Sequence, residues 1–265
     1  MIRLVAYDLD GTLIGRDLKI SQRVLDAVTR ARDAGVAGCL VTGRMYRAAL
    51  PFAWELHFEA PVICYQGAAI VDPTTDEVLF DRPLENDVVR ELIALTQADG
   101  VHLQLYRNDE YYCESRNRYS DLYASLAMTE PVIVPSLREA FAYSPATKAV
   151  VIGDEPVAAA YETRLREALG GKAYVTRSLP EFVEVLYPTV DKGTALRFVA
   201  QRLGVSMDET AAIGDSWNDL PLLQAAGVSI AMGSGPPELQ ALATGVVNDV
   251  AHDGVAEALD RYVLA

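Results

Sequence analysis

The hydrophobic pattern starts with a short apolar segment, Ile2–Tyr7, which is interrupted by Asp8-Leu9-Asp10-Gly11-Thr12. A short apolar run that ends at a glycine is typical of a buried strand. Ser21 can then cap a helix with one apolar face that ends near Gly35. A second apolar run covers residues 36–41. Strand, helix and strand with short connections predict the βαβ unit of a parallel sheet.

The middle of the chain has a different pattern. Residues 61–64 predict a third strand, and residues 69–80 predict a hairpin around Pro73. Beyond Arg82-Pro83, helical and alternating patterns mix in an α+β order. The expected elements are a helix at 87–99 and strands at 101–105, 111–113, 148–152, 174–176 and 182–186, with a helix between 152 and 174. This pattern predicts that residues 83–187 form an inserted domain within a core of residues 1–82 and 188–265.

The carboxyl-terminal part returns to an α/β pattern. A helix is expected at 194–203, closed by Gly204, and strands are expected at 211–213 and 228–232. These strands end in Gly214–Asp219 and in Gly233-Ser234-Gly235. The predicted fold class is therefore α/β, a parallel-sheet core with an inserted α+β domain.

Composition narrows the range of functions. Hydrophobic residues make up 51% of the 265 residues, which is enough for a core. The 37 acidic and 23 basic residues give a net charge of −14, which argues against nucleic-acid and membrane partners. No uncharged apolar run approaches the roughly 18 residues of a membrane span. The pattern leaves the oligomeric state open.

The first residues show no signal-peptide pattern, because the first strand leads directly into the Asp pair. The three cysteines, Cys39, Cys64 and Cys113, lie outside any CxxC motif and indicate a reducing, cytoplasmic compartment. The three histidines lack the spacing of a zinc site.

Four polar clusters follow predicted strands or precede predicted helices: Asp8 with Asp10, Thr42, Lys192, and Asp215 with Asn218 and Asp219. Because ligands bind at the carboxyl ends of parallel strands, we expect these clusters to converge. Phosphoryl transfer needs such parts. Asp8 and Asp215 could hold Mg²⁺, one carboxylate could act as nucleophile and another as general acid and base. Lys192 would offset the acidic charge, and the hydroxyl and backbone N–H of Thr42 would hold phosphoryl oxygens.

Each cluster also has a purely structural interpretation. Asp8–Gly11 and Thr42-Gly43 could be turns, and Lys192 could be a solvated lysine. Asp215–Asp219 could cap the following helix. The Gly233–Gly235 segment lacks the third glycine of a dinucleotide fingerprint and is interpreted as a turn, and no P-loop motif occurs.

Four motifs in order, DLDGT (Asp8–Thr12), VTGR (Val41–Arg44), DKG (Asp191–Gly193) and GDSWND (Gly214–Asp219), resemble the haloacid dehalogenase superfamily, in particular its Cof-type phosphatases. The resemblance implies a Rossmann-like core with an inserted α+β cap and a Mg²⁺-dependent phosphatase acting on small phosphomonoesters such as sugar phosphates, nucleotides or phosphorylated cofactors. The resemblance implies that Asp8 is the nucleophile and Asp10 the general acid/base. It also implies that Asp8, the Asp10 carbonyl and Asp215 bind Mg²⁺, with support from Asp219. Thr42 and Lys192 would bind the phosphoryl group, with Gly43, Arg44 and Asn218 nearby. One departure is Gln66-Gly67-Ala68, where the family often has Asn-Gly-Ala, so no role is carried over to Gln66.

Other functions remain open at the level of sequence. A phosphotransferase or phosphomutase on the same scaffold would pass the phosphoryl group to a sugar instead of water. A non-catalytic phosphate sensor would not need both Asp8 and Asp10, and a DxD glycosyltransferase would not explain Lys192 together with Asp215. Specificity should come from the insert. Arg107, Tyr112 and Arg116 are examples there, but each also fits an ordinary surface or packing position, so none is assigned a role.

Overall fold

The computed structural model describes all 265 residues and divides the chain into two compact units. The first unit comprises residues 1–43, 49–79 and 191–265, and the second comprises residues 44–48 and 80–190. Each unit has its own sheet, of eight and six strands respectively. The first sheet is mostly parallel and the second mostly antiparallel, so the predicted fold class, an α/β core with an inserted α+β part, is confirmed.

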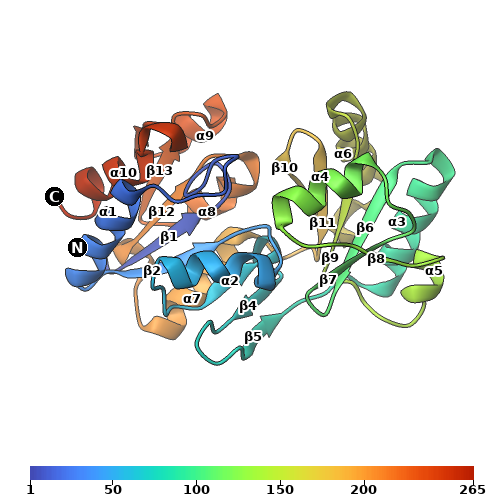
Figure 1. Ribbon diagram of the computed structural model, residues 1–265, viewed down its shortest axis with the longest axis horizontal. Helices are drawn as coiled ribbons and strands as arrows, with labels where there is room; N and C mark the ends of the chain where they lie inside the picture. The colour runs from blue at the N-terminus through green and yellow to red at the C-terminus, as the bar shows by residue number, and fades with distance from the viewer. The chain divides into compact units, whose positions relative to one another are not determined.

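The first unit is organised around β1 (Leu4–Asp8), which lies in the middle of the sheet and is buried along its whole length (Figure 1). It pairs in parallel with β2 (Ala37–Val41) on one side and with β12 (Thr210–Gly214) on the other. The strand order is β14-β13-β12-β1-β2-β3-β4-β5, in which the strands from β14 to β3 pair in parallel and β3 pairs with β4 in the antiparallel direction. The remaining strands are β3 (Val62–Cys64), β4 (Ala69–Val71), β5 (Val78–Asp81), β13 (Val228–Met232) and β14 (Gly245–Val247).

The start and the buried face of helix α1 (Gln22–Asp33) follow from its local sequence. The Ser21 hydroxyl accepts a hydrogen bond from the N–H of Val24 at 3.2 Å, as expected for an N-cap. The buried side of the helix consists of Val24, Ala27, Val28 and Ala31. The other helices wholly or partly in this unit are α2 (Tyr46–Glu55), α7 (Lys192–Leu203), α8 (Leu220–Ala225), α9 (Pro237–Leu242) and α10 (Gly254–Tyr262).

The second unit has the strand order β10-β11-β9-β6-β7-β8, in which only β7 and β8 pair in parallel. Its strands are β6 (His102–Arg107), β7 (Glu110–Cys113), β8 (Val132–Ile133), β9 (Lys148–Ile152), β10 (Tyr174–Leu179) and β11 (Phe182–Leu186). Asn108 and Asp109, both with positive φ, form the turn between β6 and β7. Its helices are α3 (Asn86–Asp99), α4 (Arg118–Ala127), α5 (Leu137–Ala140) and α6 (Glu155–Leu169).

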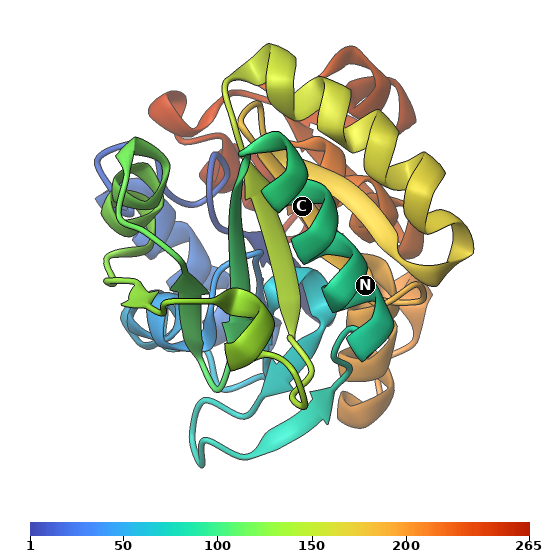
Figure 2. The same ribbon diagram turned by 90° about the vertical axis from the view of Figure 1, so that its right-hand side faces the viewer.

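Helices α3 and α6 lie across one face of this six-stranded sheet (Figure 2) and share its apolar core, in which Leu92 and Leu165 are fully buried. On the other face, Tyr123 of α4 packs edge-on against Tyr106 and Tyr111. That second face also holds a buried ion pair, in which Lys148 Nζ donates to Glu184 at 2.6 Å. Helix α4 therefore packs on the face opposite α3 and α6, against the side chains of β6 and β7.

Most predicted elements are present with small shifts at their ends, and β9, β11 and β13 have the predicted bounds. Val157 does not lie on the buried face of α6: its exposed fraction is 40%, whereas Tyr161 and Leu165 are buried. Sequence patterns missed α2, α4, α5, α9, α10, β8 and β14, which are all short. No helix has the length and apolar character that crossing a membrane requires.

Candidate active site

The site lies at the carboxyl end of the buried strand β1. Asp8 is the last residue of this strand and has an exposed fraction of 4%. The chain turns sharply after Asp10 because Gly11 adopts a φ of +88°, which side chains rarely allow. A Cβ at Gly11 would also collide with the carboxylate of Asp215. Glycine at this position therefore lets the loop after β1 approach the loop after β12.

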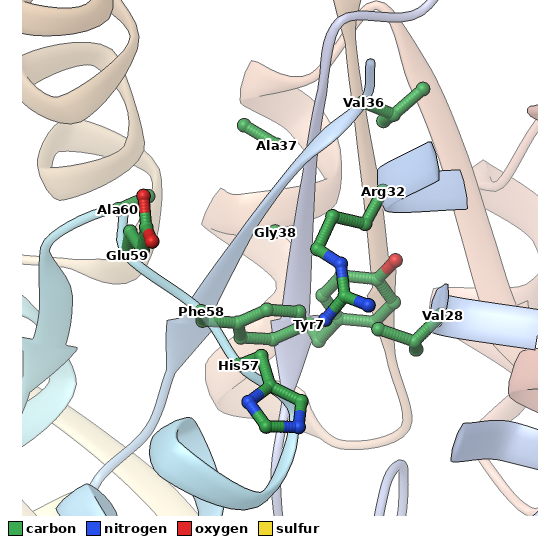
Figure 3. A pocket seen from close by; sticks show the side chains of 10 residues that line it. All are labelled: Tyr7, Val28, Arg32, Val36, Ala37, Gly38, His57, Phe58, Glu59 and Ala60. Carbon is green, nitrogen blue, oxygen red and sulfur yellow. The ribbon is translucent and has the colours of Figure 1, made fainter. Parts of the chain in front are cut away.

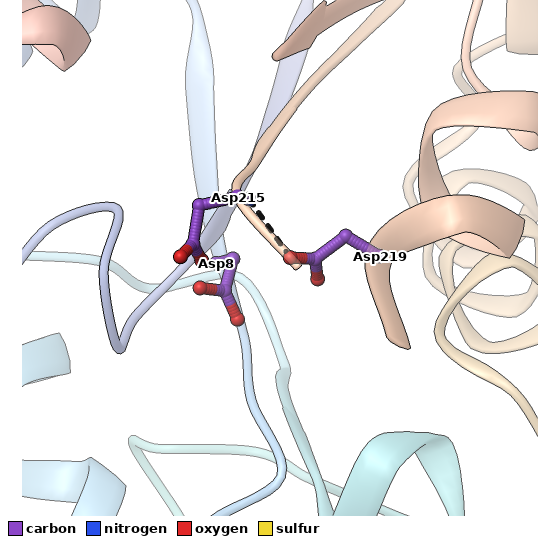
Figure 4. A group of neighbouring side chains, drawn as sticks. All are labelled: Asp8, Asp215 and Asp219. Atoms are coloured by element: carbon purple, nitrogen blue, oxygen red, sulfur yellow. Dashed lines mark hydrogen bonds between the residues drawn. The ribbon is translucent and has the colours of Figure 1, made fainter. Parts of the chain in front are cut away.

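Three carboxylates converge at these two strand ends. Figure 4 shows Asp8, Asp215 and Asp219, each of which offers an oxygen within 4.8 Å of those of the other two (Figure 4). The Thr12 hydroxyl donates a hydrogen bond to Asp215 Oδ1 at 3.3 Å, which connects the first motif to the last. The sequence separation between Asp8 and Asp215 is bridged by the parallel pairing of β1 with β12.

Lys192 lies between two of these carboxylates. Its ammonium group donates to Asp8 Oδ1 at 2.6 Å and to Asp219 Oδ1 at 2.5 Å, and the side chain is 1% exposed. Lys192 is the first residue of α7, whose N-cap Asp191 forms a capping box with Thr194. The capping box fixes the start of the helix, and with it the direction from which Lys192 enters the site.

Asp219 holds the loop that carries Asp215. Its Oδ2 accepts hydrogen bonds from the backbone N–H groups of Asp215 and Ser216, both at 3.0 Å, while its Oδ1 accepts from Lys192. Gly214 permits this turn, because a Cβ there would collide with the side chain of Asp219. Both oxygens of Asp219 are thus already engaged by donors of the protein.

A second group connects Thr42 to the last motif through Gln66. The Gln66 N–H donates to the Thr42 carbonyl at 3.0 Å, and the Asn218 amide donates to Gln66 Oε1 at 3.0 Å. Gln66 is 1% exposed and has a φ of +59°. The buried Oδ1 of Asn218 has no hydrogen-bond partner in the protein. An unsatisfied buried acceptor is costly, so Asn218 Oδ1 needs a hydrogen bond from water or from a ligand.

The electrostatics of the site follow from burial and crowding. Burial, followed by repulsion from Asp219, raises the pKa of Asp8 from 3.8 to about 7, although Lys192 acts in the opposite direction. Burial, followed by repulsion from Asp8 and Asp219, raises the pKa of Asp215 well above its usual value. Burial by itself would lower the pKa of Lys192, but Asp219 and Asp8 outweigh it and raise that pKa. The carboxylates therefore carry more negative charge than one lysine can balance.

These carboxylates fit a hard divalent cation. Mg²⁺ prefers oxygen ligands and is commonly held by one or two carboxylates. Oxygens of Asp8 and Asp215 lie within 4.8 Å of each other, and the single ammonium group of Lys192 cannot balance these carboxylates together with Asp219. Asp219 is the weaker ligand candidate, because its oxygens already accept three hydrogen bonds.

The remaining predicted residues lie as follows. Asp10 is half-buried just after β1, where its backbone forms a bridge with Ile14. Thr42 and Arg44 are both buried. Thr42 and Gly43 belong to the first unit, whereas Arg44 belongs to the second.

The prediction that the Thr42 N–H holds phosphoryl oxygens is wrong, because this N–H donates to the Ile63 carbonyl at 2.8 Å. The N–H therefore takes part in sheet pairing, which leaves the Thr42 hydroxyl as the candidate group.

Two features of the site escaped the sequence analysis or were left unassigned. Gln66 received no role, although the Gln-Gly-Ala departure from the family pattern was a visible signal. The Gly233–Gly235 turn packs against the backbone of Asp215. A Cβ at Gly235 would lie only 2.9 Å from the Asp215 carbonyl oxygen, so glycine allows this close contact. In the second unit, Arg107 packs over the rings of Phe141 and Tyr112, and Arg116 pairs with Asp121 and Glu130 at the surface.

A model of the haloacid dehalogenase-like hydrolase family matches residues 5–259. The chain belongs to this family. The resemblance to the superfamily and to its Cof-type members is thereby confirmed, and so is the prediction that the chain is an enzyme, a hydrolase of phosphoric monoesters.

Relatives of this hydrolase match it along nearly its whole length. It is 28% identical over 271 residues to an Escherichia coli protein named pyridoxal phosphate phosphatase, covering 99% of each chain. It is 28% identical over 265 residues to a Bacillus subtilis protein named 5-amino-6-(5-phospho-D-ribitylamino)uracil phosphatase, covering 98% of this chain and 97% of that one. A crystal structure of a haloacid dehalogenase-like hydrolase from Bacteroides thetaiotaomicron superimposes with a TM-score of 0.87 at 28% identity, covering 98% of this chain and 99% of the other.

Proposed function

We propose that this hydrolase is a Mg²⁺-dependent phosphatase that cleaves small phosphomonoesters through a phosphoryl group bound to Asp8. The observation that carries the proposal is the position of Lys192, which lies at 2.6 Å from Asp8 and 2.5 Å from Asp219 beside a third carboxylate, Asp215. A buried lysine can offset part of the acidic charge, and a divalent cation would offset the rest. Without both cations, the carboxylates would repel a phosphate.

In the first half-reaction, an Asp8 oxygen attacks phosphorus and the bond from phosphorus to the ester oxygen breaks. Asp10 gives its proton to the departing oxygen, so an alcohol leaves and the phosphoryl group stays on Asp8. In the second half-reaction, Asp10 takes a proton from water, and the water oxygen attacks phosphorus. Inorganic phosphate leaves and the Asp8 carboxylate is restored.

The other residues of the site bind and orient. Lys192 holds Asp8 in place and balances charge on the phosphoryl oxygens. The hydroxyl of Thr42 and the second N–H of the Asn218 amide group are proposed as further phosphoryl ligands, since the first N–H donates to Gln66. Gly43 and Arg44 are proposed on the substrate side. Bound Mg²⁺, held by Asp8, Asp215 and the Asp10 carbonyl, would withdraw charge from the phosphoryl oxygens.

The substrate class is proposed from the relatives. Two of them are named for phosphates of small cofactor-like molecules, pyridoxal and a ribitylaminouracil. We therefore propose a small phosphorylated metabolite as the substrate of this chain.

The test is phosphate release from a panel of phosphorylated sugars, nucleotides and cofactors, measured with Mg²⁺ and with a chelator. We expect release only with Mg²⁺, and none in Asp8→Asn. Asp208→Asn replaces an exposed aspartate in the same unit and should keep full activity. Rapid acid quench with labelled substrate should trap label on the wild-type chain but not on Asp8→Asn.

Three results would contradict the proposal. They are turnover by Asp8→Asn near the wild-type rate, equal rates with the chelator, or label passing to an added sugar with little free phosphate. The last result would instead identify a phosphotransferase or phosphomutase.

A further inference from the structure

A pocket with a volume of about 420 Å³ lies in the first unit and does not include any of the catalytic residues. It is formed by β1, the start of β2, the carboxyl-terminal half of α1 and the segment after α2 (Figure 3). Its lining residues include Tyr7, Arg32, Gly38, His57 and Phe58. Successive side chains of a strand point to opposite faces, so Tyr7 faces away from the side on which Asp8 works. The volume falls within the range of pockets that hold small molecules.

Two aromatic rings form one side of this pocket. The rings of Tyr7 and Phe58 stack with centroids 5.2 Å apart and an angle of 24° between their planes. Gly38 shares a sheet face with Tyr7, since Val5 pairs with Gly38 and Tyr7 with Leu40. A Cβ at Gly38 would collide with the Phe58 ring, so glycine allows the ring to lie against the strand.

The Tyr7 hydroxyl is a polar group without a partner. The side chain is 1% exposed, lines the pocket and makes no hydrogen bond to another protein group. Burial raises the pKa of Tyr7 well above its usual value, so the hydroxyl stays protonated and can donate. The hydroxyl oxygen lines the pocket, so a ligand oxygen there can accept its hydrogen bond.

Charge is arranged unevenly around the rim. Arg32 extends from α1, its side chain is 43% exposed, and its only ion-pair partner, Asp33, is 3.9 Å away. His57, with a φ of +53°, brings an imidazole to the same pocket, while Glu59 stands at the other end of the view in Figure 3. In a chain with a net charge of −14, a weakly paired arginine beside two aromatic rings is an attractive position for an anion.

We propose that this pocket is a second binding site, for a small planar aromatic molecule that carries a carboxylate. The ring lies against the Tyr7 and Phe58 rings, the carboxylate pairs with Arg32, and a ligand oxygen accepts the hydrogen bond of the Tyr7 hydroxyl. A guanidinium binds a carboxylate through two parallel N–H bonds, which favours this anion over a neutral amide.

The experiment is isothermal titration of the full chain with 2-naphthoate, and with 2-naphthamide as the uncharged analogue of the same shape. Excess Mg²⁺ and inorganic phosphate are present throughout to occupy the catalytic site. We expect 2-naphthoate to bind and 2-naphthamide to bind at least about tenfold more weakly. Arg32→Gln should weaken 2-naphthoate by about tenfold, and Tyr7→Phe by about fivefold.

Arg23→Gln is the matched control, because Arg23 lies on the same helix with an acidic partner at the same distance, 3.9 Å, and does not line the pocket. It should bind 2-naphthoate like the wild type. Thermal unfolding of each variant verifies that Tyr7→Phe and Arg32→Gln are folded. The proposal is overturned if 2-naphthoate does not bind, if the two analogues bind equally, or if Arg32→Gln and Arg23→Gln have the same affinity.

Discussion

At the scale of single residues, the site depends on one buried cation placed among buried carboxylates. Removing one partner of a buried ion pair leaves the other charge uncompensated, which costs more than the pair itself contributes. Lys192 has two such partners, Asp8 and Asp219, and all three side chains are almost completely buried. Stability and catalysis are therefore coupled at this residue.

We predict that Lys192→Met lowers the free energy of unfolding by about 3 kcal/mol in the absence of metal. Phosphatase turnover should fall by about 10²–10³-fold, because Asp8 and the phosphoryl oxygens lose their cation. Urea unfolding and phosphate release measure the two effects. Lys172→Met, at an exposed lysine whose partner Glu91 is 3.4 Å away, should change neither. Unchanged stability of Lys192→Met would show that the ion pairs do not form.

The raised pKa of Asp8, about 7 against 3.8 in the unfolded chain, predicts a pH dependence. The folded state binds the extra proton, so this group stabilises the metal-free protein below about pH 4 and loses that effect as the pH rises to about 7. Mg²⁺ needs the ionised carboxylates of Asp8 and Asp215, whose pKa values are both raised, so its affinity should increase by at least about tenfold per pH unit below pH 7.

Thermal unfolding at pH 5.5 and pH 8, with and without Mg²⁺, measures this prediction. The increase in Tm caused by Mg²⁺ should be small at the lower pH and large at the higher pH. Asp8→Asn should reduce the difference between the two pH values. An equal increase at both pH values in the wild type would contradict the assignment of the titrating group.

At the scale of elements, close backbone contacts set where the catalytic side chains point. Gly193 follows Lys192 in the first turn of α7, and a Cβ there would collide with the carbonyl oxygen of Pro221 in α8. Helices α7 and α8 can pack this closely because this position has no side chain. The position of Lys192 therefore depends on the neighbouring helix as well as on its own capping box.

We predict that Gly193→Ala lowers the free energy of unfolding by about 1–3 kcal/mol, since α7 must move away from α8. Turnover should fall with it, because the ammonium group of Lys192 shifts from Asp8. Gly171→Ala is the control, as nothing lies within 4 Å of a Cβ at Gly171. Its stability should stay within about 0.5 kcal/mol of the wild type. If Gly193→Ala is destabilised but has normal turnover, the packing of α7 against α8 does not determine the position of Lys192, and the prediction is contradicted.

The elements also show what the sequence could and could not predict. Long periodic segments such as α1 and buried runs such as β9 carry a strong pattern, and motifs with fixed spacing identified Asp8, Asp215 and Lys192. Helix α4 was missed because only three of its side chains, Ser120, Tyr123 and Ala127, are buried, and one of them is polar. The role of Gln66 depends on Asn218, 152 positions away, and pairing at that distance has no local signal.

At the scale of the whole molecule, the net charge of −14 acts against the approach of an anionic substrate. We predict that kcat/KM at saturating Mg²⁺ increases severalfold when KCl is raised from about 20 to about 200 mM, because salt screens this repulsion. Steady-state kinetics with a doubly charged phosphomonoester measures the effect. Turnover at saturating substrate should change little, and a decrease of kcat/KM with salt would show that local cations dominate the approach.

The parallel pairing of β1 with β12 also has a consequence for the newly made chain. Leu4 pairs with Thr210, so the central strand lacks one neighbour until about 200 further residues have been synthesised. At about 5–20 residues per second, the ribosome needs about 10–40 s to travel from Asp8 to Asp215. During that interval the apolar strand β1 and the carboxylate of Asp8 remain exposed, because the residues that bury them in the folded protein have not yet been synthesised. Release of a truncated chain in this window would yield a protein that chaperones or proteases must remove.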